Sequence, residues 1–495
     1  MKKVISLLII AALMLSVGLS VSAAVPKSYG YDAKASAVGA PPAYEYSAVI
    51  TGKGLGLGEF SSAADMYVAD DKLYISDTGN NRIVVLNSDY TPSSVITHVV
   101  TGQGEEALNA PRGIFYADGL LYICDSGNQR VIAIDGENKV QRTILKPDSS
   151  LVSDMADFTP SRVGVNASGT VYVIADGIYQ GFCQYDAADS FIGFFGANRV
   201  EITPTVIFQH MLKNIFTKEQ REALVRTIPT EYSNVYVDDE DIIYATTHTA
   251  TSEQVRKLNA SGSNIMVYPG SNLSLLGTGF NRKNFGDQAV NYVKGEAVKS
   301  KIVDIHKDAD GIMAVLDGQR GRIFLYDNEQ NQLCIFGGEG IQKGYFKNAV
   351  SLEKFGNDYL VADTEKNNIT VFTETKYMSN IRSAIRAYND GNYDESGRYW
   401  QMVLDKNGNL SAAFKGVGRM LLNNGDYKEA MQYLKDGNDR YYYSMAVQQY
   451  RRDFVRDNFL VMVLVAALVV TGLVFAIKYL KKWLLKGSPK AKIKG

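Results

Sequence analysis

Lys72-Leu-Tyr-Ile-Ser-Asp-Thr-Gly-Asn-Asn-Arg-Ile-Val-Val-Leu86 is followed by a near copy, Leu120-Leu-Tyr-Ile-Cys-Asp-Ser-Gly-Asn-Gln-Arg-Val-Ile-Ala-Ile134, whose Asp125 lies 48 residues after Asp77. Each copy reads as an apolar strand, a turn rich in Asp, Gly and Asn, and a second apolar strand. Weaker copies lie at residues 170–176, 241–246, 311–317 and 359–363. Six hairpins at such a spacing predict a repeat architecture.

The turn between the two strands has a structural chemistry. We expect the carboxylate of Asp77 to accept backbone N–H groups of the turn, and Arg82 to bridge back to that carboxylate or to carbonyls. Gly79 is expected to take a positive φ. The second copy repeats this set at Asp125, Gly127 and Arg130. These residues are therefore interpreted as structural, not as a catalytic set.

The hairpins and the links between them resemble the NHL repeat family, whose members form β-propellers with six four-stranded blades. The resemblance rests on the two stretches quoted above, on Asn109-Ala-Pro-Arg-Gly113, and on glycine-rich links at residues 52–60 and 336–346. It weakens in the fourth unit, where Thr246 replaces the Asp, and in the sixth, where the turn is Glu365-Lys-Asn-Asn368. The resemblance implies an all-β six-bladed propeller over residues 43–373.

Two features of that propeller follow from its length and its ends. Six blades in residues 43–373 leave about 55 residues for each, more than usual, so insertions are expected. Residues 203–230 are predicted to form short helices, with a capping box at Thr217-Lys-Glu-Gln220, and residues 267–300 an irregular insertion. Because the last unit lacks an outer strand, we expect residues 44–50 to complete the last blade.

Both ends of the chain carry targeting or membrane signals. Residues 1–24 have two lysines, an apolar run and small residues, which is the form of a cleavable signal peptide. Residues 459–477 contain no charge and are long enough to cross a bilayer as a helix. The lysine-rich segment 478–495 is predicted to be a cytoplasmic tail, which places the rest of the protein outside the cell.

Between the propeller and the membrane, residues 376–450 change to helical spacing, with Ile381, Ile385 and Tyr388 on one stripe. Gly-Asn-Tyr-Asp-Glu at residues 391–395 recurs as Gly-Asp-Tyr-Lys-Glu at 425–429, a period of 34 residues. This segment resembles a short TPR unit. Small residues at Ala413, Gly416 and Gly418 would let its helices approach closely. The segment is interpreted as either a peptide-binding groove or a spacer.

The charge distribution limits the class of partner, and the cysteine content limits the disulfides that can form. The chain of 495 residues has a net charge of -1, but residues 4–450 carry -11 and residues 451–495 carry +8. An acidic exterior does not favour nucleic acid as a partner. The cysteines Cys124, Cys183 and Cys334 are odd in number and lie in strand-like runs, so they are interpreted as buried and unpaired.

No residue stands out as a catalytic, cofactor-binding or metal-binding group. Histidine occurs at positions 98, 210, 248 and 306, with no spacing typical of metal ligands. Calcium at the propeller centre is the one cofactor considered, with Asp65, Asp157, Asp238 and Asp304 near strand starts. Many of the tyrosines occupy one repeated strand position, and most are therefore expected to pack within the propeller blades. These are Tyr74, Tyr122, Tyr172, Tyr244 and Tyr359.

The sequence thus predicts a single-pass protein of the cell membrane, with an extracellular propeller and TPR-like segment, that binds a protein or glycan ligand. Two other functions remain open. One is a metal-dependent propeller hydrolase or lyase that acts on a lactone, a sugar or a peptide end. The other is an accessory subunit of a membrane transport assembly, for instance one that carries sugars.

Overall fold

The structure is a computed structural model that describes residues 28–32, 36–150, 152, 157–196, 231–247, 254–266, 285–287, 291–293, 296–298 and 300–486. It contains two compact units, Met1–Arg382 and Ser383–Gly495, and each is described by itself. The predicted signal peptide 1–24, the helical insertion 203–230 and the end of the tail lie outside the described residues.

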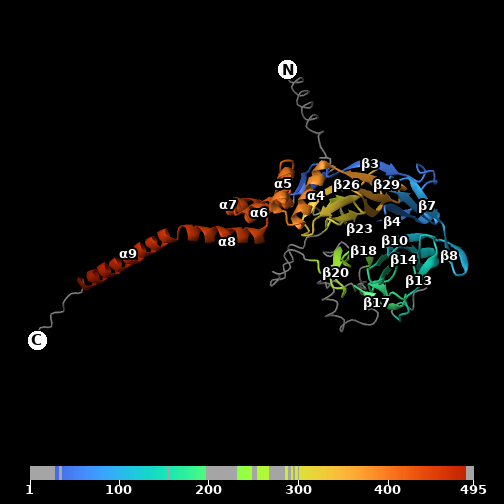
Figure 1. Cartoon of the computed structure of the whole chain (residues 1–495), viewed down its shortest axis with the longest axis horizontal. Coiled ribbons are helices and arrows are strands. Elements are labelled where there is room, and N and C mark those ends of the chain that lie inside the picture. Colours follow the sequence, from blue (N-terminus) through green and yellow to red (C-terminus); the bar gives the residue numbers. More distant parts are fainter. Residues whose placement is uncertain are drawn as a thin grey trace, which may run out of the picture. The chain divides into compact units, whose positions relative to one another are not determined.

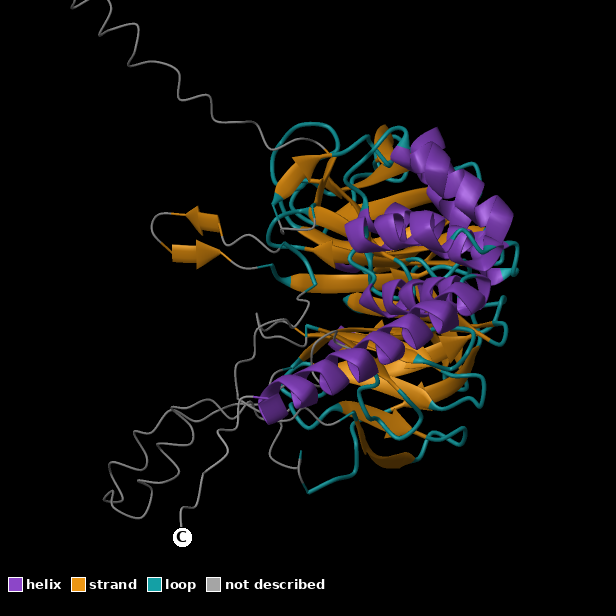
Figure 2. Cartoon of the chain, turned by 90° about the vertical axis from the view of Figure 1, so that its left-hand side faces the viewer, coloured by secondary structure: helices purple, strands orange, loops and turns teal. Residues whose placement is uncertain are grey.

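The first unit is a six-bladed β-propeller (Figures 1 and 2). Blade 1 consists of β4 (Ala63–Ala69), β5 (Lys72–Asp77), β6 (Arg82–Asn87) and β7 (Pro92–Ile96). Blade 2 consists of β10 (Pro111–Ala117), β11 (Leu120–Asp125), β12 (Arg130–Ile134) and β13 (Val140–Ile144). Blade 3 consists of β14 (Pro160–Val165), β15 (Val171–Ala175), β16 (Phe182–Tyr185) and β17 (Phe191–Phe195). Blade 4 consists of β18 (Tyr232–Val237), β19 (Ile243–Thr247) and β20 (Val255–Leu258).

Blades 5 and 6 draw strands from both ends of the propeller sequence. Blade 5 consists of β23 (Ile302–Lys307), β24 (Met313–Asp317), β25 (Arg322–Tyr326) and β26 (Gln332–Gly337), extended by β1 (Ser28–Tyr31) and β2 (Ala37–Gly39). Blade 6 consists of β27 (Ala349–Phe355), β28 (Asp358–Asp363), β29 (Asn368–Glu374) and β3 (Tyr44–Ile50). Two further hairpins join β8 (His98–Thr101) to β9 (Gly104–Ala107), and β21 (Asn291–Val293) to β22 (Glu296–Val298).

The predicted closure of the ring is confirmed. Strand β3 pairs antiparallel with β29, from Ile50 opposite Ile369 to Tyr44 opposite Glu374. The innermost strands β4, β10, β14, β18, β23 and β27 adjoin one another in turn around the ring. Since the N-terminal strand supplies the outer edge of the C-terminal blade, the two ends of the propeller hold each other in place.

The first strand, β1, lies ahead of residue 43, outside the range predicted for the propeller. It pairs with β26 at the outer edge of blade 5. The hydroxyls of Tyr29 and Tyr31 donate to one carboxylate oxygen of Asp287 at 2.5 and 2.6 Å, and Arg320 donates to the other oxygen at 2.5 Å. Arg322 pairs with the same carboxylate. One buried acid thus fastens the N-terminal strand to the blade.

The repeated turn follows the prediction for Asp and Arg. Asp77 accepts the backbone N–H of Ser61 at 2.7 Å, and Arg82 donates to Asp77 at 2.7 Å and to the Leu57 carbonyl at 2.7 Å. Asp125 and Arg130 repeat this arrangement. The acids at the matching positions of blades 5 and 6, Asp317 and Asp363, also each accept the N–H of the residue 16 positions earlier.

The prediction for glycine in this turn is wrong. The left-handed residues are Asn81 and Gln129, with φ of 53° and 57°, and Gly79 and Gly127 have no positive φ. A Cβ atom at Gly79 would instead lie 2.3 Å from Ser61 Oγ, so glycine is required there by close approach. Strand pairing also shifts two alignments by one residue, because Ala175 and Thr247, not Asp176 and Thr246, occupy the place of Asp77.

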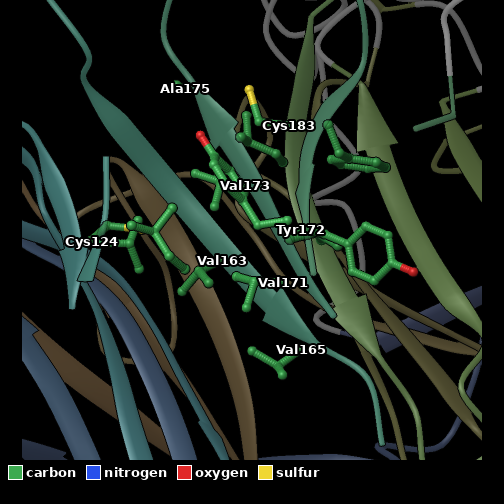
Figure 3. Close-up of a cluster of buried hydrophobic side chains, with 14 of the residues drawn as sticks. Cys124, Val163, Val165, Val171, Tyr172, Val173, Ala175 and Cys183 are labelled. Atoms are coloured by element: carbon green, nitrogen blue, oxygen red, sulfur yellow. The ribbon is translucent and has the colours of Figure 1, made fainter. Parts of the chain in front are cut away.

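Apolar residues between the blades form the core, since neighbouring blades cover both faces of each sheet. Figure 3 shows part of one such cluster, which draws side chains from blades 2, 3 and 4 and contains Cys124 and Cys183. All three cysteines are buried and unpaired, as predicted. The five tyrosines at the repeated strand position are also buried, as predicted.

The second unit consists of helices. The chain leaves the propeller through α4 (Lys376–Asn389), and α5 (Tyr393–Leu404), α6 (Ser411–Asn424), α7 (Tyr427–Asp436) and α8 (Arg440–Asp457) pack in sequence order. The expected close approach occurs: a Cβ atom at Gly416 would lie 2.0 Å from the Trp400 ring, and one at Gly418 would lie 2.6 Å from Leu434. Helix α9 (Phe459–Lys486) begins where the span was predicted, and within the described residues it is the helix long and apolar enough to cross a membrane.

Candidate functional site at the mouth of the central channel

The innermost strands of all six blades share one irregularity near their first residues. In each, the pairing with the second strand shifts by one residue, which is a β-bulge. The extra residues are Ala64, Arg112, Ser161, Ser233, Val303 and Val350. Because bulges re-aim side chains, this end of the channel, which we call the mouth, receives one unpaired position from every blade.

A cavity of about 280 Å³ lies at the mouth, and five of the six bulge residues line it. Other lining side chains are largely polar: Gln319 and Asn348 contribute amides, Arg162 and Lys301 contribute cations, and Glu231 contributes a carboxylate. The lining therefore offers both hydrogen-bond donors and acceptors to a ligand.

Two of the charged groups at the mouth are already engaged with the protein. Arg112 donates to Asp176 at 2.6 Å in a partly exposed ion pair. Glu231 accepts the backbone N–H of Gly177 at 3.1 Å. These contacts hold side chains of blades 2 and 3 at the rim, where a ligand would meet them.

Beneath the mouth, the residues that directly follow the six bulge residues form a largely polar ring around the channel, which we call the polar ring. Asp65 accepts the N–H of Ile114 at 2.9 Å and the hydroxyl of Ser351 at 3.2 Å. Asp304 accepts the N–H of Leu352 at 2.6 Å and the side-chain amide of Asn234. Each contact joins neighbouring blades. The six positions are Asp65, Gly113, Arg162, Asn234, Asp304 and Ser351.

Arg162 is the cation of this ring. It reaches from blade 3 past blade 2 and donates to the Ala64 carbonyl of blade 1 at 3.2 Å. Blade 2 carries Gly113 at this level, where a Cβ atom would lie 2.6 Å from the Arg162 Cα. Glycine is therefore needed where the backbone of β14 passes close to β10, and the charge of Arg162 acts on the carboxylates of both Asp65 and Asp304.

Both carboxyl groups are held in an environment that disfavours their charge. Burial, followed by the negative charge of Asp65, raises the pKa of Asp304 to about 7, although Arg162 opposes the change. Burial likewise raises the pKa of Asp65, against the effect of Arg162. The ring therefore takes up a proton more readily than ordinary carboxylates do.

We expect the stability of the propeller to depend on pH through Asp304. Because its pKa is higher in the folded than in the unfolded chain, the folded state gains stability at low pH and loses it as pH rises from about 4 to 7. Asp304→Asn removes this dependence. Thermal unfolding from pH 4 to 8 should show the wild type losing stability relative to the variant as pH rises, and a constant difference across this range would contradict the assignment.

Two residues further along the innermost strands, aromatic and titratable side chains meet in pairs. The rings of Tyr67 and Phe115 lie 4.8 Å apart, and those of Tyr236 and His306 lie 5.2 Å apart. His306 Nδ1 lies 2.9 Å from Glu353 Oε1. Burial disfavours the imidazolium, but the Glu353 carboxylate outweighs it and raises the pKa of His306. This level is a buried ionic and aromatic packing layer below the polar ring.

Of the four aspartates considered for calcium, the structure brings only two together. Asp65 and Asp304 lie in the polar ring, whereas Asp157 accepts from Gln129 and Asp238 pairs with Lys307 at 2.7 Å. His98 is exposed beside Thr97, and His210 and His248 lie outside the described residues. Within the described part of the chain, no three His, Cys, Asp or Glu residues are placed to hold a metal ion.

Sequence reasoning missed the bulge residues and Arg162. The sequence indicates roughly where each innermost strand begins. The position of a bulge, however, depends on the pairing register of the strand, which the hairpin pattern does not reveal. The available signal was that residue types vary from blade to blade at the strand starts, where polar and charged residues mix with apolar ones, whereas the turn between the second and third strands is repeated in the first two blades.

Comparison with known proteins adds distant structural likenesses. No protein-family model matches the chain, and no curated protein matches it. Virginiamycin B lyase from Staphylococcus aureus is 10% identical with a TM-score of 0.39, covering 64% of this chain and 97% of its own. A streptogramin B lyase structure is 7% identical with a TM-score of 0.37, covering 64% and 96%. Hydrazine synthase from Kuenenia stuttgartiensis is 12% identical with a TM-score of 0.39, covering 67% and 82%. Likenesses this distant assign no activity to the chain.

Proposed function

We propose that the protein is a membrane-anchored extracellular binding protein whose propeller recognises a protein or glycan ligand at the mouth of its central channel. The observation that carries the proposal is the mouth cavity itself, with five bulge residues from five blades in its lining. Ligands of propellers and barrels commonly enter such concave sites, where a few placed polar groups give orientation.

The chemistry of the lining supports a polar ligand. Amides at Gln319 and Asn348 and charges at Lys301 and Glu231 suit the hydroxyls of a sugar or the backbone and termini of a peptide. The resemblance of the helical segment 376–450 to a TPR unit is consistent with a spacer between propeller and membrane.

The membrane side of the proposal rests on α9 and on charge. Helix α9 is uncharged over residues 459–477, and the lysines that follow residue 477 fit the cytoplasmic side. The propeller and helical segment would then lie outside the cell, anchored by one helix.

Binding is tested with full-length protein in detergent micelles on oligosaccharide and peptide arrays. The double variant Lys301→Ala, Gln319→Ala should weaken binding of the recognised probes by about tenfold or more, because both side chains line the mouth. Lys72→Ala is the matched control, since β5 begins at the opposite end of the channel. Binding that the double variant leaves unchanged, or no binding on either array, would contradict the proposal.

A further inference from the structure

The last eleven residues of α8 are a helical segment without a protein core. The first part of α8 is held within the helical unit: Asp439 caps it by accepting the N–H of Tyr442, and Arg419 lies 4.3 Å from the Tyr442 ring centre. Ala446 is the buried residue of this helix. From residue 447 to 457 every side chain is exposed or half-buried.

Apolar side chains nevertheless form a stripe along this segment. Tyr443, Val447, Tyr450 and Phe454 are spaced by four, three and four residues, which places them on one face of the helix. Tyr450 is 40% exposed and Phe454 is 53% exposed. A contiguous exposed apolar stripe of this kind indicates a surface that contacts a membrane or another molecule.

One basic side chain lies beside the stripe. Arg451 follows Val447 by four residues and so flanks the same face, whereas Arg452 and Arg456 lie on the other side of the helix. Arg456 pairs with Asp453 at 2.9 Å and with Asp457 at 3.0 Å, but the Arg456 side chain is 69% exposed and such pairs contribute little. Arg451 and Arg452 form no ion pair with any described residue.

The position of α8 directly before α9 indicates that this stripe contacts the membrane. Only Asn458 separates the two helices. At about 1.5 Å per residue, Phe454 lies within about 8 Å of the start of the apolar helix, and Tyr450 within about 14 Å, so the stripe begins at the depth of lipid headgroups. Tyrosine and arginine suit that layer, because aromatic bodies rest at the interface while guanidinium groups contact phosphate.

We propose that residues 447–457 of α8 bind the phosphate headgroups of the same bilayer that α9 spans. This inference rests on the proposed membrane anchoring. The surface would hold the helical unit against the outer leaflet, with Tyr450 and Phe454 in the headgroup layer and Arg451 on a lipid phosphate.

The test uses full-length protein in lipid nanodiscs and single introduced cysteines that carry a fluorophore. The native cysteines are buried, and burial raises the pKa of Cys183 to about 12, so they will not compete for the label. Tyr450→Cys reports the stripe, Gln448→Cys reports the opposite, exposed side of the same helix, and Leu468→Cys reports the span. Quenchers are a headgroup-labelled lipid, a lipid labelled deep in its acyl chain, and aqueous iodide.

In phosphatidylcholine discs with about 30% phosphatidylglycerol, the headgroup quencher should act about twofold more strongly on the label at 450 than on that at 448. Adding Arg451→Glu should abolish this difference without changing quenching at 468. Equal quenching at 450 and 448 with a quenched label at 468 would overturn the inference while leaving the anchor intact. Protection at 450 from both lipid and iodide would also overturn it, in favour of a protein partner. A label at 468 that the deep quencher does not reach would contradict the anchor itself.

Discussion

Deletion of residues 43–50 is expected to lower the unfolding temperature of the propeller by about 10 °C or more, or to prevent folding. The deletion removes the whole of β3, uncovers the pairing edge of β29, and exposes apolar surface around Ile369 and Val371. Thermal unfolding followed by circular dichroism measures the effect. An unchanged unfolding temperature would show that the ring does not depend on its N-terminal strand.

Two point variants in β3 separate the contribution of side-chain burial to stability from that of strand pairing. Ile50 is buried in the cluster between blades 6 and 1, whereas its neighbour Val49 is 38% exposed. Ile50→Ala should therefore cost about 2–5 kcal/mol in unfolding free energy, and Val49→Ala well under about 1 kcal/mol. Equal losses would mean that β3 is not seated with Ile50 facing inward.

Arg382→Met is expected to destabilise the propeller by about 3–5 kcal/mol. Arg382 is only 3% exposed, and its guanidinium donates to Asp308 and Asp310 at 2.5 Å and to Glu374 at 3.1 Å. It also donates to the Tyr44 hydroxyl of β3 at 3.1 Å. Replacement by an apolar residue of similar length leaves these carboxylates buried without their shared cation. Chemical denaturation at pH 7 measures the loss.

Because the loss of stability in Arg382→Met arises from charge, we expect it to depend on pH. Burial would raise the pKa of Asp308, but Lys354 and Arg382 outweigh it and hold the pKa below its ordinary value. The stability that this pairing supplies is thus present above the ordinary carboxyl pKa and is lost as pH falls below about 4. The difference in unfolding free energy between wild type and Arg382→Met should narrow toward pH 3. Lys376 is an exposed cation of the same helix, so Lys376→Ala should unfold with the same free energy as wild type. A gap independent of pH would assign the effect to packing.

Much of the fold was predictable because it repeats. Hairpins such as 72–86 carry their own strand and turn signals, and a missing outer strand in the last unit required a donor from the other end of the chain. Strand β1 was not predictable in this way. Its attachment depends on Asp287, which meets Tyr29 across 258 residues of sequence.

The candidate site was less predictable than the fold for a physical reason. The polar ring needs Arg162, Asp65 and Asp304 at one level of the channel, and that level is set by where each bulge falls. A shift of one residue in pairing would turn these side chains to the other face of the sheet. The glycine at position 113 shows the same dependence, because its small size matters only once the backbone of Ser161 and Arg162 packs against it.

The six bulges bear on how the proposed recognition could change. Ala64, Arg112, Ser161, Ser233, Val303 and Val350 occupy no pairing position in the sheets. Five of them line the mouth, so under the proposed function single substitutions there would alter what the propeller recognises while the strand pairing stays the same, much as residues vary in binding loops on a rigid scaffold. Those five positions would then offer an engineer a compact library for new specificities.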